Sequence, residues 1–293
     1  EIGVGERTLK KADLDAMARL KEPLQNVHGQ WVETTREEIV AALDFWENRK
    51  ADAITARELV QLGLGRMDTS AGIPFDGVVA TGWLDVLLSR MQKEEEISPV
   101  DMPAGFKGEL RPYQKRGYDW LDFLRAWGFG ACLADDMGLG KTIQTLVLIQ
   151  TEHEFDEVRP VLIVCPTSVL SNWEHEARRF TPGLSCYVHH GPGRPHGARF
   201  VQRASDHAIV LTSYALLQRE REDLAAVAWA GLVVDEAENI KNRDTKQSQA
   251  IRERSADYRI GLTGTPVENH VGDLYSIMDV LNPGSLGTPE EFK

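Results

Sequence analysis

A glycine-containing loop between an apolar run and a helical pattern places the strongest constraint on the fold of this 293-residue chain. The apolar run 129–134 predicts a buried strand, and 143–149 predicts a helix that starts directly after the sequence DDMGLGKT. Such a helix start presents unpaired amides and the positive end of its dipole, which together make an anion site. There Lys141 can reach the β and γ phosphates of a nucleotide, and the Thr142 hydroxyl can bind Mg²⁺. Asp135 occupies the first glycine position of the usual G-x-x-x-x-G-K-T pattern, so the match is imperfect.

The residues from Leu110 onward alternate between short apolar runs and helical patterns, which is typical of βαβ units around a parallel sheet. We expect an α/β fold with an open, doubly wound sheet that binds ligands at the carboxyl ends of its strands. The predicted strands are 129–134, 161–165, 186–189, 208–211, 231–234 and 258–262.

Residues 1–97 differ from the rest of the chain in the spacing of their apolar residues. Apolar residues recur at helical spacing in 12–20, 34–46, 55–64 and 83–91, so residues 1–97 predict a smaller, mostly helical domain. The charge run KEEE at 93–96 and the prolines that follow it predict a linker over 98–109. The α/β domain then covers 110–293.

A pair of acids follows the predicted strand 231–234. Asp235 at the end of a strand can hold Mg²⁺, and Glu236 can orient and deprotonate an attacking water. Paired acids at a strand end are common and are usually solvated. Their coupling to a phosphate loop makes Asp235, Glu236 and Lys141 the candidate catalytic residues.

Composition limits the partners of the chain. With 33 basic and 45 acidic residues the formal charge is −12, and the chain has no basic tail, so non-specific binding to a polyanion is disfavoured unless a local groove reverses the sign. The three cysteines form no C-x-x-C pair and predict reduced core thiols. The chain lacks a signal pattern and a long apolar run, which predicts a cytoplasmic, nucleoid-associated location and no membrane partner.

With the two site motifs placed, residues 110–290 resemble the prokaryotic branch of the Swi2/Snf2 family, in superfamily 2 of helicase-like ATPases. The resemblance implies a first RecA-like ATPase lobe with motifs Q, I, Ia, Ib, II and III. An acid at the first glycine position is usual in this family, so Asp135 supports the assignment. The segment HGQWVE at 28–33 is similar to the region that precedes the ATPase core in bacterial members.

The family motifs imply roles for individual residues. The implied ATP-binding residues come from LRPYQ and the phosphate loop: Arg111, Gln114, Asp136, Met137, Gly138, Leu139, Gly140, Lys141, Thr142 and Ile143. Thr142 and Asp235 would bind Mg²⁺, and Thr263, Gly264 and Thr265 of motif III would couple the ATP site to movement. The implied DNA contacts are Pro166, Thr167 and Ser168 of motif Ia with Thr212 and Ser213 of motif Ib, whose hydroxyls and amides suit phosphate oxygens. Glu238 stands where the family has His or Gln, which puts the coupling in question.

The resemblance implies a DNA-dependent ATPase that translocates on double-stranded DNA and remodels protein–DNA complexes, with ATP as substrate and Mg²⁺ as cofactor. Its partners would be double-stranded DNA and an unknown protein, and we expect a monomer. A strand-separating helicase and a non-catalytic nucleotide-sensing or partner-binding module are the alternatives. The family's second lobe and its arginine finger, worth about 10³ to 10⁵ in turnover, do not follow before Lys293, so we expect a fragment that hydrolyses ATP very slowly by itself.

Two further features have competing interpretations. Trp173 could contact nucleic acid, but its helical spacing with Ala177 and Phe180 favours core packing. The segment HHGPGRPH at 189–196 could hold a metal through its histidines. We favour a flexible basic loop near DNA, because the sequence nearby offers no carboxylate or cysteine to complete a ligand set.

Overall fold

The computed structural model describes residues 97–155, 159–242, 245–267, 271–283 and 286, together with four short strands near the N-terminus. The chain divides into two compact units, Glu1–Ala80 and Thr81–Lys293. The predicted boundary at the linker 98–109 is not tested by this division and stays a prediction.

The first unit contains two antiparallel strand pairs that the helical patterns did not predict. Strand β1 (Ile2–Val4) pairs with β2 (Arg7–Leu9), and β3 (Leu24–Val27) pairs with β4 (Gln30–Glu33), which carries Trp31. The helices predicted over 12–20, 34–46, 55–64 and 83–91 lie outside the described residues.

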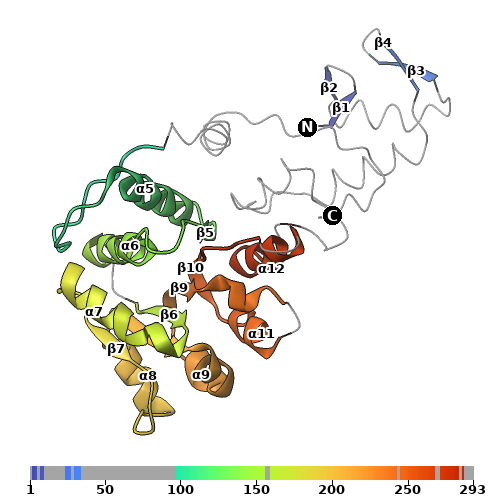
Figure 1. Cartoon of the computed structure of the whole chain (residues 1–293). Helices are drawn as coiled ribbons and strands as arrows, with labels where there is room; N and C mark the ends of the chain where they lie inside the picture. The colour runs from blue at the N-terminus through green and yellow to red at the C-terminus, as the bar shows by residue number, and fades with distance from the viewer. Residues whose placement is uncertain are drawn as a thin grey trace. The chain divides into compact units, whose positions relative to one another are not determined.

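The second unit is built on a six-stranded parallel sheet in the order β5-β10-β9-β6-β8-β7 (Figure 1). The strands are β5 (Ala131–Leu133), β6 (Val161–Cys165), β7 (Cys186–Val188), β8 (Ile209–Ser213), β9 (Trp229–Asp235) and β10 (Ala256–Leu262). Each of the six predicted strands is confirmed. Their ends differ by up to two residues, because strand propensity does not fix where a ladder stops.

Helices cover both faces of this sheet, as expected for a doubly wound fold (Figure 1). On one face lie α5 (Pro112–Ala126), α6 (Lys141–Phe155) and α7 (Leu170–Phe180). The other face carries α8 (Ala198–Ser205), α9 (Tyr214–Arg219), α10 (Arg221–Ala225), α11 (Lys246–Arg252) and α12 (Val271–Leu281). Two short 3₁₀ segments, η2 (Thr167–Val169) and η3 (Ala237–Ile240), follow the ends of β6 and β9.

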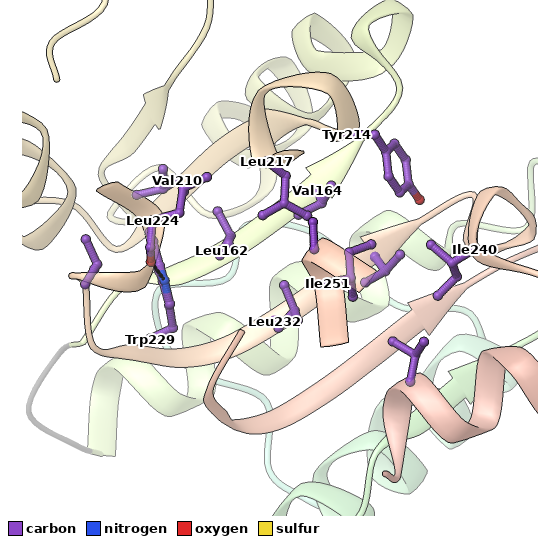
Figure 2. Packing of buried hydrophobic residues seen from close by; sticks show 14 of the residues in the cluster. Leu162, Val164, Val210, Tyr214, Leu217, Leu224, Trp229, Leu232, Ile240 and Ile251 are labelled. Atoms are coloured by element: carbon purple, nitrogen blue, oxygen red, sulfur yellow. Dashed lines mark hydrogen bonds between the residues drawn. The ribbon is translucent and has the colours of Figure 1, made fainter. Parts of the chain in front are cut away.

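Alternate residues of the central strands fill the core beneath the second helical layer. Figure 2 shows Leu162, Val210 and Leu232 from three neighbouring strands packed with Leu217 of α9 and Ile251 of α11. All five residues of β6 and of β8 are buried, so both faces of these strands are covered. Continuous apolar runs in the sequence therefore correspond to strands between two helical layers.

The three cysteines were predicted to be reduced thiols of the core. All three are free thiols, and burial together with the nearby carboxylates of Asp235 and Glu236 raises the pKa of Cys165 to about 12.

In the described part of the chain, the helices are too short or too polar to cross a bilayer.

Candidate nucleotide-binding site

The predicted site motifs meet at the carboxyl edge of the sheet because their strands are neighbours. Leu133 at the end of β5 is in register with Leu262 of β10, and Leu262 is in register with Asp235 of β9. The phosphate loop, motif III and the acid pair therefore leave the sheet side by side, although more than a hundred residues separate the first from the last.

The phosphate loop has the backbone that its glycines allow. Gly138 and Gly140 both have φ of 82°, a left-handed conformation that favours glycine, and α6 begins at Lys141. The Lys141 Nζ donates to the carbonyl oxygens of Asp135 at 2.5 Å and Asp136 at 3.1 Å, so the ammonium group lies within its own loop. This places a cation and a helix start together, as the sequence predicts for an anion site.

Asp135 has a structural partner that explains why an acid replaces the first glycine. The Nε2 of Gln144, a fully buried residue on α6, donates to the Asp135 Oδ2 at 2.9 Å. A Cβ at Gly117 of α5 would lie 1.9 Å from the Gln144 Oε1, so a larger residue there would displace the Gln144 side chain that bonds Asp135. No sequence pattern predicts this pairing, because Gln144 is only a glutamine three residues after Lys141.

Helix α5 also holds the loop from the other side. Gln114 Nε2 donates to the Leu139 carbonyl at 2.9 Å and its Oε1 accepts from the Arg111 amide at 2.9 Å, while the Tyr113 hydroxyl donates to the same Leu139 carbonyl. Gln114 is buried and Arg111 is exposed. In this structure the Gln114 amide is thus satisfied by protein groups, and its contact with adenine stays a prediction.

The acid pair is held by residues from outside its own segment. Trp173 Nε1 donates to Asp235 Oδ2 at 2.8 Å, and the Glu236 amide donates to Asp235 Oδ1 at 3.0 Å. Burial raises the pKa of Asp235, although these bonds and the nearby Lys141 oppose the shift. Core packing of Trp173 is confirmed by its exposure of 1%, but the prediction missed its bond to the candidate metal ligand.

Glu236 adopts an unusual backbone conformation. Its φ of 52° makes it the non-glycine residue with positive φ among the described residues. The Tyr214 hydroxyl donates to the carbonyls of Asp235 at 2.5 Å and Glu236 at 3.2 Å, and Asn239 Nδ2 donates to the Glu236 carbonyl at 2.8 Å. Burial, Asp235 and Glu238 raise the pKa of Glu236, which suits a group that must accept a proton.

Glu238 places a third carboxylate beside this pair. Its charge raises the pKa of both Asp235 and Glu236, and its Oε2 is buried without a hydrogen-bond partner in the described part of the chain. A buried acceptor without a donor is costly. The residue that departs from the family pattern therefore has a buried oxygen whose hydrogen-bonding requirement is not met by the described residues.

The motif III residues contact the phosphate loop. The Thr263 amide donates to the Leu133 carbonyl at 3.2 Å, and Thr263 Oγ1 accepts from the Thr265 amide at 3.0 Å. A Cβ at Gly264 would lie 3.0 Å from the Cγ of the exposed Met137, so Gly264 lies close to the phosphate loop. The structure thus places Thr263 beside the end of β5 and Gly264 beside Met137, and the coupling role of Thr263, Gly264 and Thr265 stays a prediction.

The candidate DNA contacts fall on neighbouring strand ends but differ in exposure. Thr167 and Ser168, after Pro166 at the end of β6, are exposed. Thr212 is fully buried and donates to the His189 carbonyl at 3.4 Å, while Ser213 Oγ accepts from the Leu216 amide as the N-cap of α9. Phosphate contacts by Thr212 and Ser213 stay a prediction that requires their side chains to change partners.

The structure corrects one part of the interpretation of 189–196 as a flexible basic loop near DNA, because the charge of Arg194 is paired; its nearness to DNA stays a prediction. His189 is fully buried, with its Nε2 2.6 Å from Glu220 Oε2 and its Nδ1 2.9 Å from the Tyr187 hydroxyl. Arg194 Nε donates to Glu220 Oε1 at 2.6 Å, so the loop's charge is paired. Glu220 lies in the turn between α9 and α10, 26 residues after Arg194, which the local sequence could not reveal.

The structure places two carboxylates beside His196, although the sequence near the loop offered none to complete a metal site. Ligand atoms of His196, Glu220 and Asp223 lie within 4.8 Å of one another. The Arg194 guanidinium already occupies the Glu220 carboxylate, so this group holds a positive charge without a metal ion.

The sheet order, the phosphate loop and the acid pair define a RecA-like α/β lobe of the nucleotide-binding class. The SNF2-related domain family matches residues 113–293, and the family described as SNF2 Helicase protein matches residues 1–64. The chain belongs to the SNF2-related family.

Characterised relatives cover most of this chain, whereas it covers a minor part of each of them. It is 40% identical to the putative ATP-dependent helicase/translocase YwqA of Bacillus subtilis, over 96% of this chain and 32% of that protein. It is 33% identical to the ISWI chromatin-remodeling complex ATPase ISW1 of Saccharomyces cerevisiae, over 66% of this chain and 17% of that one.

Two solved structures also match. The Sulfolobus solfataricus SWI2/SNF2 ATPase core in complex with dsDNA has a TM-score of 0.60 and 47% identity, over 67% of this chain and 40% of that chain. A second structure, the Sulfolobus solfataricus SWI2/SNF2 ATPase core domain, has a TM-score of 0.60 and 46% identity, over 68% of this chain and 40% of that chain. The likeness therefore extends from sequence to fold.

Proposed function

We propose that this chain supplies the ATP-binding lobe of a DNA-dependent ATPase that translocates on double-stranded DNA and remodels protein–DNA complexes. The observation that carries the proposal is the shared edge at which the phosphate loop, the acid pair and Thr263 leave three neighbouring strands. A lobe of this kind needs a phosphate cradle, a metal ligand and a base within reach of one nucleotide.

The residues fit ATP with Mg²⁺. Lys141 and the loop amides would bind the phosphates, and Thr142 and Asp235 offer hydroxyl and carboxylate oxygens, which are the hard donors that Mg²⁺ prefers. Bound Mg²⁺ would neutralise phosphate charge. Glu236, whose pKa burial raises, would take the proton of the attacking water.

Double-stranded DNA is the partner that the relatives support, because the Sulfolobus core was solved with it. Thr167 and Ser168 are the exposed hydroxyls at the edge predicted to meet phosphate. The net charge of −12 means that binding must come from local groups rather than from the charge of the whole chain.

The substitution Glu236→Gln in the full-length gene product tests the catalytic assignment. We expect ATP binding to persist and turnover to fall by about 10² to 10⁴, the range for loss of a general base. Titration with a fluorescent ATP analogue and a phosphate-release assay measure the two quantities. Undiminished turnover would contradict the role of Glu236, and a wild-type protein that binds but never hydrolyses ATP would favour the nucleotide-sensing alternative.

The same preparation separates translocation from strand separation. A forked duplex whose strands stay paired while ATP is consumed supports a translocase. Displacement of one strand from that fork would favour the helicase alternative.

A further inference from the structure

Two buried aromatic residues connect the strand ends predicted to face DNA with the acid pair. Trp173 lies in the first turns of α7, five residues after Ser168, and its Nε1 donates to Asp235 Oδ2. Tyr214 begins α9 directly after Ser213, and its hydroxyl donates to the carbonyls of Asp235 and Glu236. Motif Ia and motif Ib therefore each contribute one hydrogen-bond donor to the segment that carries Asp235 and Glu236.

The sheet register makes these connections short. In the order β9-β6-β8, Val164 is in register with Val234 of β9, and Cys165 is in register with Ser213 of β8. The segments after β6 and β8 thus leave the sheet next to the segment that carries Asp235. A shift of either segment would move a hydrogen-bond donor of the acid pair.

Neither aromatic side chain is placed to contact DNA. Trp173 has 1% of its surface exposed and Tyr214 has 5%, so stacking on bases is excluded while they stay in place. Their polar atoms are already engaged with Asp235 and Glu236. Any effect they have on hydrolysis must pass through those acids.

The backbone at Glu236 needs such support. A non-glycine residue with φ of 52° is strained, and strain of this kind persists only where the surroundings hold it. The Glu236 carbonyl accepts from the Tyr214 hydroxyl as well as from Asn239 of its own turn. Tyr214 is thus the donor from another motif that fixes this conformation.

We propose that Trp173 and Tyr214 are positioning residues that transmit DNA contact at the ends of β6 and β8 to the acid pair, Trp173 through the Asp235 carboxylate and Tyr214 through the backbone carbonyls of Asp235 and Glu236. The inference rests on the proposed function, since it assumes hydrolysis that DNA stimulates. DNA that engages the exposed Thr167 and Ser168 shifts η2 and the start of α7, and Trp173 passes that shift to Asp235. Tyr214 does the same for Glu236 from the start of α9.

The test uses Trp173→Phe and Tyr214→Phe in the full-length gene product. Both replacements keep an aromatic ring in the core and remove the donor. We expect the ratio of DNA-stimulated to basal turnover to fall by about 10-fold or more in Trp173→Phe, the value of a hydrogen bond to a charged group, and by about fivefold in Tyr214→Phe, whose bonds are to neutral carbonyls. The KM for ATP and the Kd for duplex DNA stay within about twofold of the wild type, because neither residue reaches the ligands.

Two matched controls separate positioning from general loss of packing. Trp229→Phe removes a buried indole donor that bonds the Leu224 carbonyl, and Tyr118→Phe removes a buried hydroxyl that bonds Thr151. Thermal melting confirms that all four variants fold, and the controls keep the wild-type stimulation ratio. Tyr214→Phe loses a single oxygen atom, so it keeps the test usable if Trp173→Phe unfolds.

Each outcome bears on the inference. An unchanged ratio in the folded variants overturns it, and so does an equal loss of basal and stimulated turnover, which would assign these residues to support of the acids alone. A wild-type protein without DNA-stimulated turnover contradicts the proposed function and this inference with it. Wild-type stimulation with an unchanged ratio in the variants contradicts the inference only.

Discussion

At the scale of single residues, the site depends on side chains that hold other side chains. Asp135 is fixed by Gln144, Leu139 by Gln114, and Asp235 by Trp173. Lys141, Thr142, Asp235 and Glu236 could be proposed from the loop and the acid pair, because their chemistry follows from residue type and spacing. The other candidate ATP residues follow only from the family resemblance, and their contacts with ATP stay predictions. The supporting side chains could not be predicted, because hydrogen bonds across strands leave no local pattern.

The Asp135–Gln144 pair gives a test at this scale. Gln144→Glu places a second carboxylate against Asp135 in a buried setting, and the repulsion should loosen the phosphate loop. We expect affinity for ATP to fall by about tenfold, which corresponds to about 1.4 kcal/mol. Titration with a fluorescent ATP analogue measures it. The same replacement at the exposed Gln202 of α8 should leave affinity unchanged, and equal affinity in both variants would refute the role of the pair.

At the scale of elements, the sheet is fastened by contacts between segments far apart in sequence. Asn282, at the end of α12, bonds both the amide and the carbonyl of Gly130 at 2.8 Å, just before β5. The six parallel strands were predicted because continuous apolar runs suit a sheet covered on both faces. The two hairpins of the first unit were missed because strands of three or four residues are too short to show a clear alternating pattern in sequence.

The Asn282 bonds predict a stability effect. Asn282→Ala leaves the buried Gly130 amide and carbonyl without partners, and we expect the free energy of unfolding to fall by about 2 kcal/mol. Urea denaturation followed by circular dichroism measures it. Asn172→Ala, which removes an exposed bond to Glu176, is the control and should change stability by less than about 0.5 kcal/mol. Equal losses in both variants would refute the role of Asn282.

The buried His189 predicts a pH dependence. Burial lowers its pKa, helped by Arg194 and His196 and opposed by Glu220, so the unfolded chain takes up the proton first as pH falls below about 6.5. Stability is therefore present at neutral pH and is lost on acidification. Glu220, whose pKa is also lowered by its bonds to Arg194 and His189, adds its own loss only below about pH 4.5.

The expected result is a melting temperature that falls between about pH 7.5 and about pH 5.5, with a smaller fall in His189→Gln. Differential scanning fluorimetry at the two pH values measures both. His175→Gln, at an exposed position on α7, should keep the wild-type fall. If the melting temperature of His189→Gln falls as much as that of the wild type, groups other than His189 cause the pH dependence.

At the scale of the whole molecule, an acidic chain is proposed to act on a polyanion. The net charge of −12 gives no general attraction, and Arg194 and His196, the cations that the sequence offered as a basic loop, face Glu220 instead. Family membership rests on residues 113–293, whereas the names putative helicase/translocase and chromatin-remodeling complex ATPase belong to proteins of which this chain covers 32% or less. Sequence motifs thus determine the class, and the activity of the complete protein needs a direct test.

That test is the rate of ATP hydrolysis by the full-length gene product with and without duplex DNA, beside Lys141→Ala. We predict that duplex DNA raises the turnover number and that Lys141→Ala abolishes hydrolysis in both conditions, because Lys141 would bind the β and γ phosphates. A turnover number that does not change with DNA, or hydrolysis that persists in Lys141→Ala, would contradict the proposal that this chain supplies the ATP-binding lobe of a DNA-dependent ATPase.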